Sequence, residues 1–233
     1  MIQIYQAANG KYYSRTPSFN HEPCAPVREP GGKRKAPHRR ISYVNIPFLQ
    51  KDFIVCESDL ERDCVLIASL NPEVTRIEYQ PQRFNLGKTG EHIPDFRISY
   101  RSAPQSYIEV KPEVFAYETE TWEKICAAHQ FFKSQGIVYE YMSDRAIERG
   151  NRHHNATYIH RCGKLPIPIE QSQRIIEVAN RYPDGIRMED LQAITGLLND
   201  HILHCVGNRH LTLNEFFEYQ QTSMIYPLQG ECK

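Results

Sequence analysis

Three charged residues occur in a pattern that suits hydrolysis of a phosphodiester. They are Asp95, Glu109 and Lys111. Two converging carboxylates suit a hard divalent cation with oxygen ligands, and Mg²⁺ fits best. A neighbouring lysine can orient a water or hold the scissile phosphate, while the cation activates that water and steadies the leaving oxygen. The pattern also fits a surface hairpin with ordinary alternating charges, because an aspartate followed by Glu-x-Lys often arises by chance.

Two predicted β-strands bring these residues to one place. Apolar and polar residues alternate after Asp95, and a second strand runs through Glu109 and ends before Pro112, which cannot donate a ladder hydrogen bond. Residues 101–105 have the composition of a turn, so the two strands should form a hairpin. Because side chains alternate along a strand, Glu109 and Lys111 share one face, which Asp95 can meet from the partner strand.

A helix is predicted over residues 57–70, where apolar residues recur at helical spacing. Glu57 and Glu61 are four residues apart and share one side of that helix if both lie within it. Glu61 is the favoured catalytic residue, with Glu57 as its substitute. The competing interpretation is a capping box, since Ser58-x-x-Glu61 precedes an apolar run. The two roles conflict, because a glutamate bent back to the cap is less free to bind a metal.

The predicted elements follow the order helix with Glu, strand, strand with Pro-Asp, strand with Glu-x-Lys, helix, strand. Their motifs are Ser58-Asp59-Leu60-Glu61, Gln80-Pro81, Pro94-Asp95-Phe96, Glu109-Val110-Lys111-Pro112 and Thr121-Trp122-Glu123-Lys124. This α/β order resembles the restriction-endonuclease-like core, a mixed sheet flanked by helices. The finer resemblance is to the TnsA family, the endonuclease subunit of heteromeric cut-and-paste transposases. It covers the chain from about residue 40 to about residue 145.

The resemblance implies a role for each candidate residue. Glu61, Asp95 and Glu109 would hold the metal, together with the backbone carbonyl of Val110, and Lys111 would be the active-site lysine. The implied cofactor is Mg²⁺ in a two-ion site, with Mn²⁺ as a substitute. Some family members carry glutamine where this chain has Glu109. Glutamate is the better ligand for Mg²⁺, so this difference strengthens the expectation of activity.

Basic residues are concentrated in the first 40 residues. The whole chain balances 28 Lys and Arg against 28 Asp and Glu, but residues 1–40 carry a net charge of +6, residues 41–160 of −4 and residues 161–233 of −2. Prolines argue against regular structure in this arm, so we expect a flexible segment that follows a DNA backbone, with a solvated tail as the alternative. The nearly neutral body implies weak DNA binding without partners. The candidate DNA contacts are Lys33, Arg34, Lys35, Arg39 and Arg40.

The predicted organisation has four parts. Beyond the nuclease part, three short helices and a strand or wing resemble a winged helix, a fold that binds DNA or other proteins. This part is slightly acidic, which favours a protein partner over DNA. The parts are a basic arm at 1–40, a nuclease catalytic domain at 41–160, a linker at 161–168 and a winged-helix-like domain at 169–233.

Composition restricts the class of protein further. With 40% hydrophobic and 24% charged residues the chain is globular, no apolar run approaches the ~18 residues of a membrane span, and no signal peptide is expected. The seven cysteines lack paired spacing, which favours reduced core thiols in a cytoplasmic protein. The resemblance implies that this protein is bacterial and associated with DNA. The ten histidines lack zinc-finger spacing. We expect His153 and His154 in a turn, and His201 and His204 on a helix.

The sequence therefore predicts a metal-dependent DNA endonuclease in which water attacks a phosphodiester in line. The resemblance implies that it cuts the 5′ ends of a transposon. It also implies docking to a recombinase-type transposase subunit and to an AAA+ regulator, which would handle ATP because this chain has no phosphate-binding glycine loop. A stand-alone restriction or repair nuclease remains an alternative, as does a non-catalytic adaptor that recruits the regulator.

Overall fold

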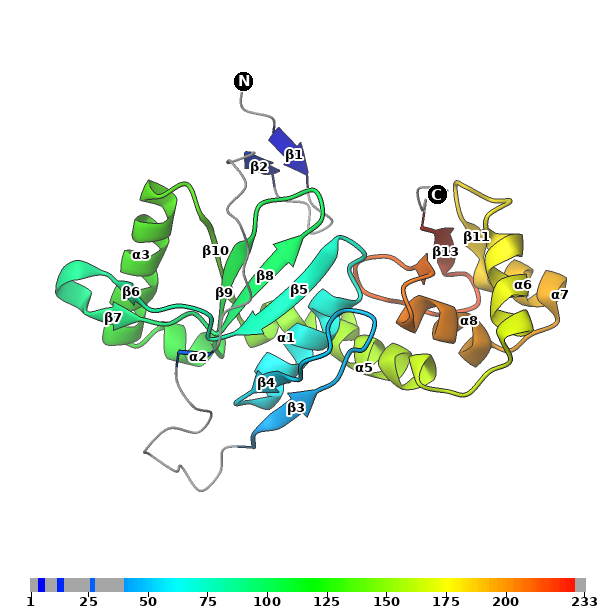
Figure 1. The fold of residues 1–233 in the computed structure, drawn as a ribbon, viewed down its shortest axis with the longest axis horizontal. Helices are drawn as coiled ribbons and strands as arrows, with labels where there is room; N and C mark the ends of the chain where they lie inside the picture. The colour runs from blue at the N-terminus through cyan, green and yellow to red at the C-terminus, as the bar shows by residue number, and fades with distance from the viewer. Residues whose placement is uncertain (1–3, 7–11, 15–25, 28–39, 229–233) are drawn as a thin grey trace. The chain divides into compact units, whose positions relative to one another are not determined.

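The computed structural model describes residues 4–6, 12–14, 26–27 and 40–228 (Figure 1). The chain divides into two compact units. The first comprises Met1–Ser69 and Glu73–Ile147, and the second comprises Leu70–Pro72 and Glu148–Lys233. Among the helices of the described residues, none has the length and the apolar content that a membrane span requires.

The first unit is built on a mixed four-stranded sheet in the order β10-β9-β8-β5. β8 pairs antiparallel with both β5 and β9, whereas β10 runs parallel to β9. The return from β9 to a parallel β10 needs a crossover, which the helices between these two strands supply. The strands are β5 (Val74–Tyr79), β8 (Phe96–Tyr100), β9 (Ser106–Val110) and β10 (Val138–Met142).

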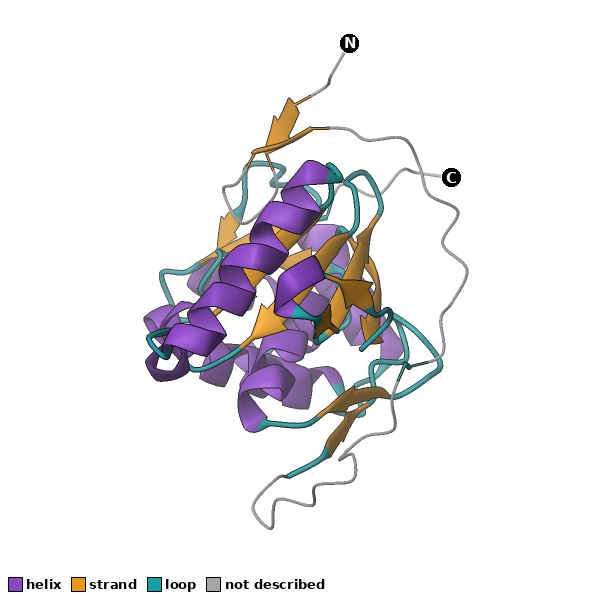
Figure 2. Cartoon of the chain, turned by 90° about the vertical axis from the view of Figure 1, so that its left-hand side faces the viewer, coloured by secondary structure: helices purple, strands orange, loops and turns teal. Residues whose placement is uncertain are grey.

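Helices cover both faces of this sheet. The side chains of Phe96, Ile98 and Ile108 pack with Cys64 and Val65 of α1 (Asp59–Ser69) in one hydrophobic core. The opposite face is covered by α3 (Thr119–Ser134), which lies across the sheet toward the viewer in Figure 2. The result is a mixed α/β arrangement, consistent with the restriction-endonuclease-like core expected from the sequence.

The core under α3 is aromatic. Phe132 is fully buried, and its ring stacks on Tyr139 at 4.8 Å between centroids and on Tyr107 at 5.2 Å. Phe84 meets the same ring edge-on at 4.6 Å. Burial of a phenylalanine side chain contributes about 1.5–3 kcal/mol, so this cluster fixes α3 against β9 and β10.

Short elements complete the first unit. Three pairs of strands form two-stranded antiparallel sheets: β1 with β2, β3 with β4, and β6 with β7. The β1–β2 pair lies within the part of the chain for which irregular structure was expected, so that expectation is wrong for these residues. The elements are β1 (Ile4–Gln6), β2 (Tyr12–Ser14), β3 (Ser42–Val44), β4 (Ile54–Cys56), β6 (Phe84–Asn85), η1 (Gly87–Thr89), β7 (Glu91–His92), α2 (Glu113–Ala116) and α4 (Asp144–Glu148).

The second unit combines helices with a small antiparallel sheet in the order β11-β13-β12. From α6 onward its elements follow the order helix, strand, helix, helix, strand, strand, which contains the three helices and the short strand predicted from the sequence. The elements are η2 (Arg149–Asn151), α5 (Arg152–Gly163), α6 (Ile169–Ala179), β11 (Ile186–Arg187), α7 (Met188–Thr195), α8 (Asn199–Gly207), β12 (Leu211–Thr212) and β13 (Met224–Pro227).

Helix α5 changes the expected domain boundary. It packs against α8 at two glycines, where a Cβ on Gly207 would lie 2.6 Å from the carbonyl oxygen of Ile159 and 2.9 Å from the Cα of Gly163. Because only glycine permits this approach, α5 belongs to the second unit. The second unit therefore includes residue 148 onward rather than starting after a linker at 161–168, and only residues 164–168 connect α5 to α6.

The predictions for the histidine segments were confirmed for one pair and wrong for the other. His153 and His154 lie in α5, so the expected turn is wrong, whereas His201 and His204 lie in α8, as predicted. Five cysteines are free thiols and four of these are buried, as expected of core thiols. The other two, Cys24 and Cys232, lie outside the described residues.

Candidate active site

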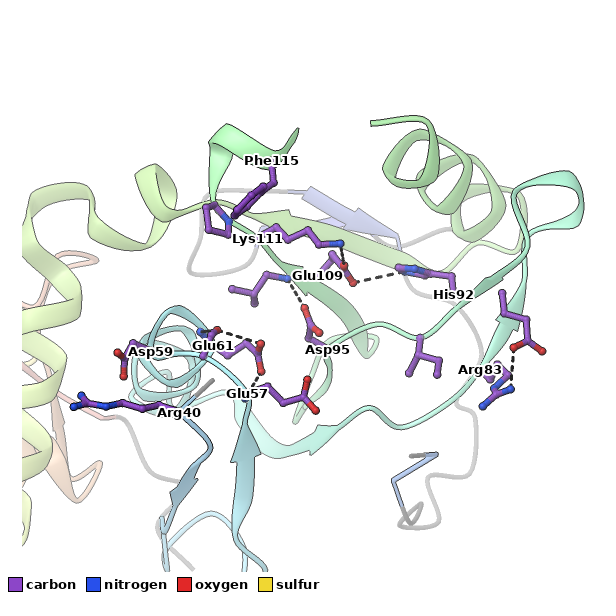
Figure 3. Close-up of a pocket in the computed structure, with 15 residues that line it drawn as sticks. Arg40, Glu57, Asp59, Glu61, Arg83, His92, Asp95, Glu109, Lys111 and Phe115 are labelled. Atoms are coloured by element: carbon purple, nitrogen blue, oxygen red, sulfur yellow. Dashed lines mark hydrogen bonds and ion pairs between the residues drawn. The ribbon is translucent and has the colours of Figure 1, made fainter. Parts of the chain in front are cut away.

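A cleft of about 920 Å³ opens in the first unit and contains all four residues predicted to be catalytic (Figure 3). Most of its lining comes from three short segments: the start of α1 with the residues just before it, the chain from β7 into β8, and the end of β9. The four are Glu61, Asp95, Glu109 and Lys111.

The strand register explains why Asp95 and Glu109 meet. Phe96 of β8 pairs with Ile108 of β9 in an antiparallel ladder, so one step further Asp95 stands opposite Glu109. Asp95 Oδ2 accepts a hydrogen bond of 2.8 Å from the backbone N–H of Val110. This bond fixes the aspartate against the strand that carries the other two charged residues.

Lys111 lies beside Glu109, as their shared face predicted. Its Nζ donates a hydrogen bond of 3.1 Å to Glu109 Oε1. The lysine side chain is 43% exposed, whereas that of Glu109 is 8% exposed. The amine therefore lies at the open side of the cleft, where an incoming phosphate can reach it, and the carboxylate lies beneath.

The carboxylates are held in an environment that disfavours their negative charge. Burial raises the pKa of Asp95 well above its usual value, and the charges of Glu109 and Glu61 raise it further. Burial is also the main reason why the pKa of Glu61 is raised. A cation placed among these groups would relieve both the burial cost and the mutual repulsion. The electrostatics of the cleft therefore suit a bound divalent ion.

Glu61 is engaged in capping helix α1. Its backbone N–H donates to Ser58 Oγ at 3.1 Å, and its side chain accepts from the Ser58 hydroxyl at 3.1 Å and from the Glu57 N–H at 2.8 Å. Glu57 precedes the helix, and its Oε1 accepts a hydrogen bond of 2.6 Å from the Tyr79 hydroxyl. Both glutamates line the cleft, and the cap interaction that competes with metal binding by Glu61 is present.

The donor set is made of oxygens, as Mg²⁺ prefers. In the described part of the chain, however, no three His, Cys, Asp or Glu side chains are already arranged to hold one ion. One oxygen of Asp95 is engaged with Val110, and both oxygens of Glu61 are engaged at the cap. The residues fit a divalent cation by chemistry and charge, and binding requires their side chains to reorient.

Sequence reasoning missed His92 and Tyr139. The Nε2 atom of His92 lies 3.8 Å from Glu109 Oε2, and the buried Tyr139 hydroxyl has a raised pKa because of burial and the charges of Glu109 and Asp95. His92 reaches the cleft on the β6–β7 hairpin. Its position depends on packing against residues that are far from it in the sequence. The only available signal was its place three residues before Asp95.

The basic arm is described only in part. Arg40 is exposed and lines the cleft, which is consistent with a contact to DNA near the site. The other four candidate DNA contacts, Lys33, Arg34, Lys35 and Arg39, lie outside the described residues.

Comparison with known families gives one match. Residues 71–144 match the family described as TnsA-like endonuclease N terminal. The resemblance to the TnsA family is confirmed. The TnsA-like segment runs from β5 to the start of α4 and includes Asp95, Glu109 and Lys111, whereas Glu61 lies outside it. No curated protein sequence matches the chain. The TnsA-like endonuclease domain supports a nuclease of transposition as the general function.

Proposed function

We propose that this protein is the metal-dependent DNA endonuclease subunit of a transposase and that it cuts the 5′ ends of a transposon. The observation that carries the proposal is the convergence of Asp95, Glu109 and Lys111 in one cleft of the TnsA-like segment. The antiparallel strands β8 and β9 present these side chains, and a hydrogen bond from the Val110 N–H to Asp95 links the two strands at the site.

Each residue has a role in hydrolysis. Asp95 and Glu109, with the Val110 carbonyl and Glu61, would hold Mg²⁺, or Mn²⁺ as a substitute. The bound ion, in a one- or two-ion site, would polarise the phosphoryl oxygen and lower the pKa of the attacking water. Lys111 holds the scissile phosphate or orients the water, which attacks phosphorus in line. The bond from phosphorus to the leaving oxygen then breaks, and that oxygen takes up a proton.

The proposal includes partners. The body of the nuclease unit is acidic, since residues 41–147 carry 11 Lys and Arg against 16 Asp and Glu, a net charge of −5. Such a surface gives weak non-specific DNA binding, so we infer that a recombinase-type transposase subunit brings the transposon ends and makes the 3′-end cuts and joining. We further propose that the elements from α6 to β13 of the second unit form a winged-helix-like arrangement that docks an AAA+ regulator, supported by their element order and their net negative charge.

A cleavage assay in which the transposase subunit and Mg²⁺ are each added or left out tests this function. Transposon-end DNA is incubated with Mg²⁺ and the chain, with and without the neighbouring transposase subunit, and each mixture is repeated with EDTA. We expect cutting only when both the partner and Mg²⁺ are present. Cutting by the chain alone would identify a stand-alone nuclease, and the absence of metal-dependent cutting in every mixture would identify an adaptor.

A further inference from the structure

His92 places a buried imidazole nitrogen in the cleft, beside the carboxylate of Glu109. Its side chain is 13% exposed, and its Nε2 atom is buried 3.8 Å from Glu109 Oε2 (Figure 3). Within the part of the chain that the structure describes, this nitrogen has no hydrogen-bond partner. A buried imidazole nitrogen without a partner is costly unless a ligand or an ion completes its environment.

The imidazole ring is held in place by the aromatic core. His92 is the cross-strand neighbour of Phe84 in the β6–β7 hairpin. Its ring lies edge-on to Tyr139 at 5.6 Å and to Phe132 at 6.4 Å between centroids. The hairpin can turn tightly because Gly87 and Gly90 adopt positive φ angles of 71° and 85°. Packing of the ring, rather than a hydrogen bond, therefore directs Nε2 of His92 at the carboxylate of Glu109.

The pair of His92 and Glu109 is neither a hydrogen bond nor a strong ion pair. A separation of 3.8 Å is too long for a hydrogen bond. Bonds of about 2.1 Å from an ion to each of two ligand atoms span up to about 4.2 Å. The distance of 3.8 Å therefore allows Nε2 and Oε2 to contact one ion together.

We propose that His92 is a nitrogen ligand of the divalent ion held by Asp95 and Glu109. This inference rests on the proposed function, and it adds a residue that the oxygen-only ligand set lacks. An imidazole ligand raises the affinity for Mn²⁺ and later transition metals relative to Mg²⁺, which prefers oxygen. The site would therefore bind Mn²⁺ more tightly than an all-oxygen site would, while Mg²⁺ remains a competent ion.

Pulsed electron paramagnetic resonance of Mn²⁺ bound to the full chain tests this inference directly. The ¹⁴N modulation of a coordinated imidazole should appear in the wild-type protein and disappear in His92→Phe, which preserves the aromatic packing. His92→Gln is a second variant in case the phenylalanine disturbs the hairpin. His129→Phe is the matched control, because His129 is an exposed residue of α3 that does not line the cleft.

Calorimetry gives an independent readout of selectivity. The dissociation constant of Mn²⁺ should rise about tenfold in His92→Phe, whereas that of Mg²⁺ should change less than about twofold. Loss of Mn²⁺ binding in Asp95→Ala would show that the measured ion binds at the site of Asp95 and Glu109. Binding that depends on Asp95 but shows no imidazole nitrogen in the wild type would overturn the role of His92 alone. A wild-type chain that binds no Mn²⁺ would overturn both this inference and the proposed metal dependence.

Discussion

Ser58 and Glu61 are joined by two reciprocal hydrogen bonds of 3.1 Å, one from the Glu61 N–H to Ser58 Oγ and one from the Ser58 hydroxyl to Glu61 Oε1. The same glutamate therefore caps helix α1 and lines the cleft with Asp95 and Glu109. An observed structural role and a proposed metal-binding role meet in one side chain. Substitutions that preserve one role and remove the other can separate them.

Glu61→Gln should retain the cap and weaken metal binding. Glutamine also serves in a capping box, so thermal stability should change by less than about 1 kcal/mol. The lost charge should reduce Mg²⁺ affinity and slow cleavage by about tenfold or more. Ser58→Ala is the matched control, since it should cost about 1 kcal/mol of stability and leave cleavage nearly intact. Full cleavage activity in Glu61→Gln would restrict this residue to the cap.

Asp95→Asn should make the metal-free protein more stable. The asparagine side chain can still accept the hydrogen bond from Val110, and it removes a buried charge whose pKa is raised by burial and by two carboxylates. We expect a gain of about 1 kcal/mol, or about 2–4 °C, measured by calorimetry near pH 7. Asp52→Asn, at a side chain that is 79% exposed, should change stability little.

The pH dependence of this gain follows from the direction of the shift. The folded pKa of Asp95 lies above its unfolded value near 4, so the folded state holds this proton more tightly. The wild type therefore has its full stability below about pH 4 and loses part of it as pH rises through the folded pKa. The advantage of Asp95→Asn should disappear on acidification. An advantage that persists below about pH 4 would contradict this explanation.

The affinity for the metal ion should rise as the pH increases above the ordinary pKa values of carboxylates. Because the pKa values of Asp95 and Glu61 are raised, an ion that binds at a pH below them displaces protons from these groups. Calorimetric titration of Mn²⁺ in buffers of different ionisation enthalpy measures the released protons. An affinity that stays constant with pH, with no proton release, would show that the ion binds elsewhere.

Lys111→Ala should reduce cleavage by about 100-fold or more, because in the proposed mechanism the amine beside Glu109 stabilises the charge that develops on the phosphate. Thermal stability should change little, since the side chain is 43% exposed. Lys124→Ala is the control. Lys124 pairs with Glu120 on the surface of α3, outside the cleft, and its loss should leave the rate unchanged. Equal rates for the two variants would remove Lys111 from the mechanism.

Local sequence signals were sufficient for the hairpin that carries the site. The alternation after Asp95, the turn at 101–105 and the end of the strand before Pro112 together determine that Asp95 faces Glu109. The Ser58-x-x-Glu61 pattern predicted both the cap and its conflict with metal binding. These features depend on residues close together in the chain, where periodicity and turn chemistry are informative.

Features that depend on distant packing were missed. His92 reaches the cleft because Phe84, Tyr139 and Phe132 fix its hairpin, and a two-residue strand has too little periodicity to reveal this arrangement. Helix α5 was also missed, because its apolar face is weak and its contact with α8 depends on the approach of Gly163 and Gly207. Neither contact leaves a signal in a short window of sequence.

Strand-resolved cleavage of an end-labelled transposon-end DNA tests the central claim most directly. The reaction contains Mg²⁺ and the transposase subunit, and wild-type chain is compared with Asp95→Ala. The proposed function predicts a cut at the 5′ end of the transposon with the wild type and none with the variant. A 5′-end cut of equal yield with Asp95→Ala would contradict hydrolysis at this cleft.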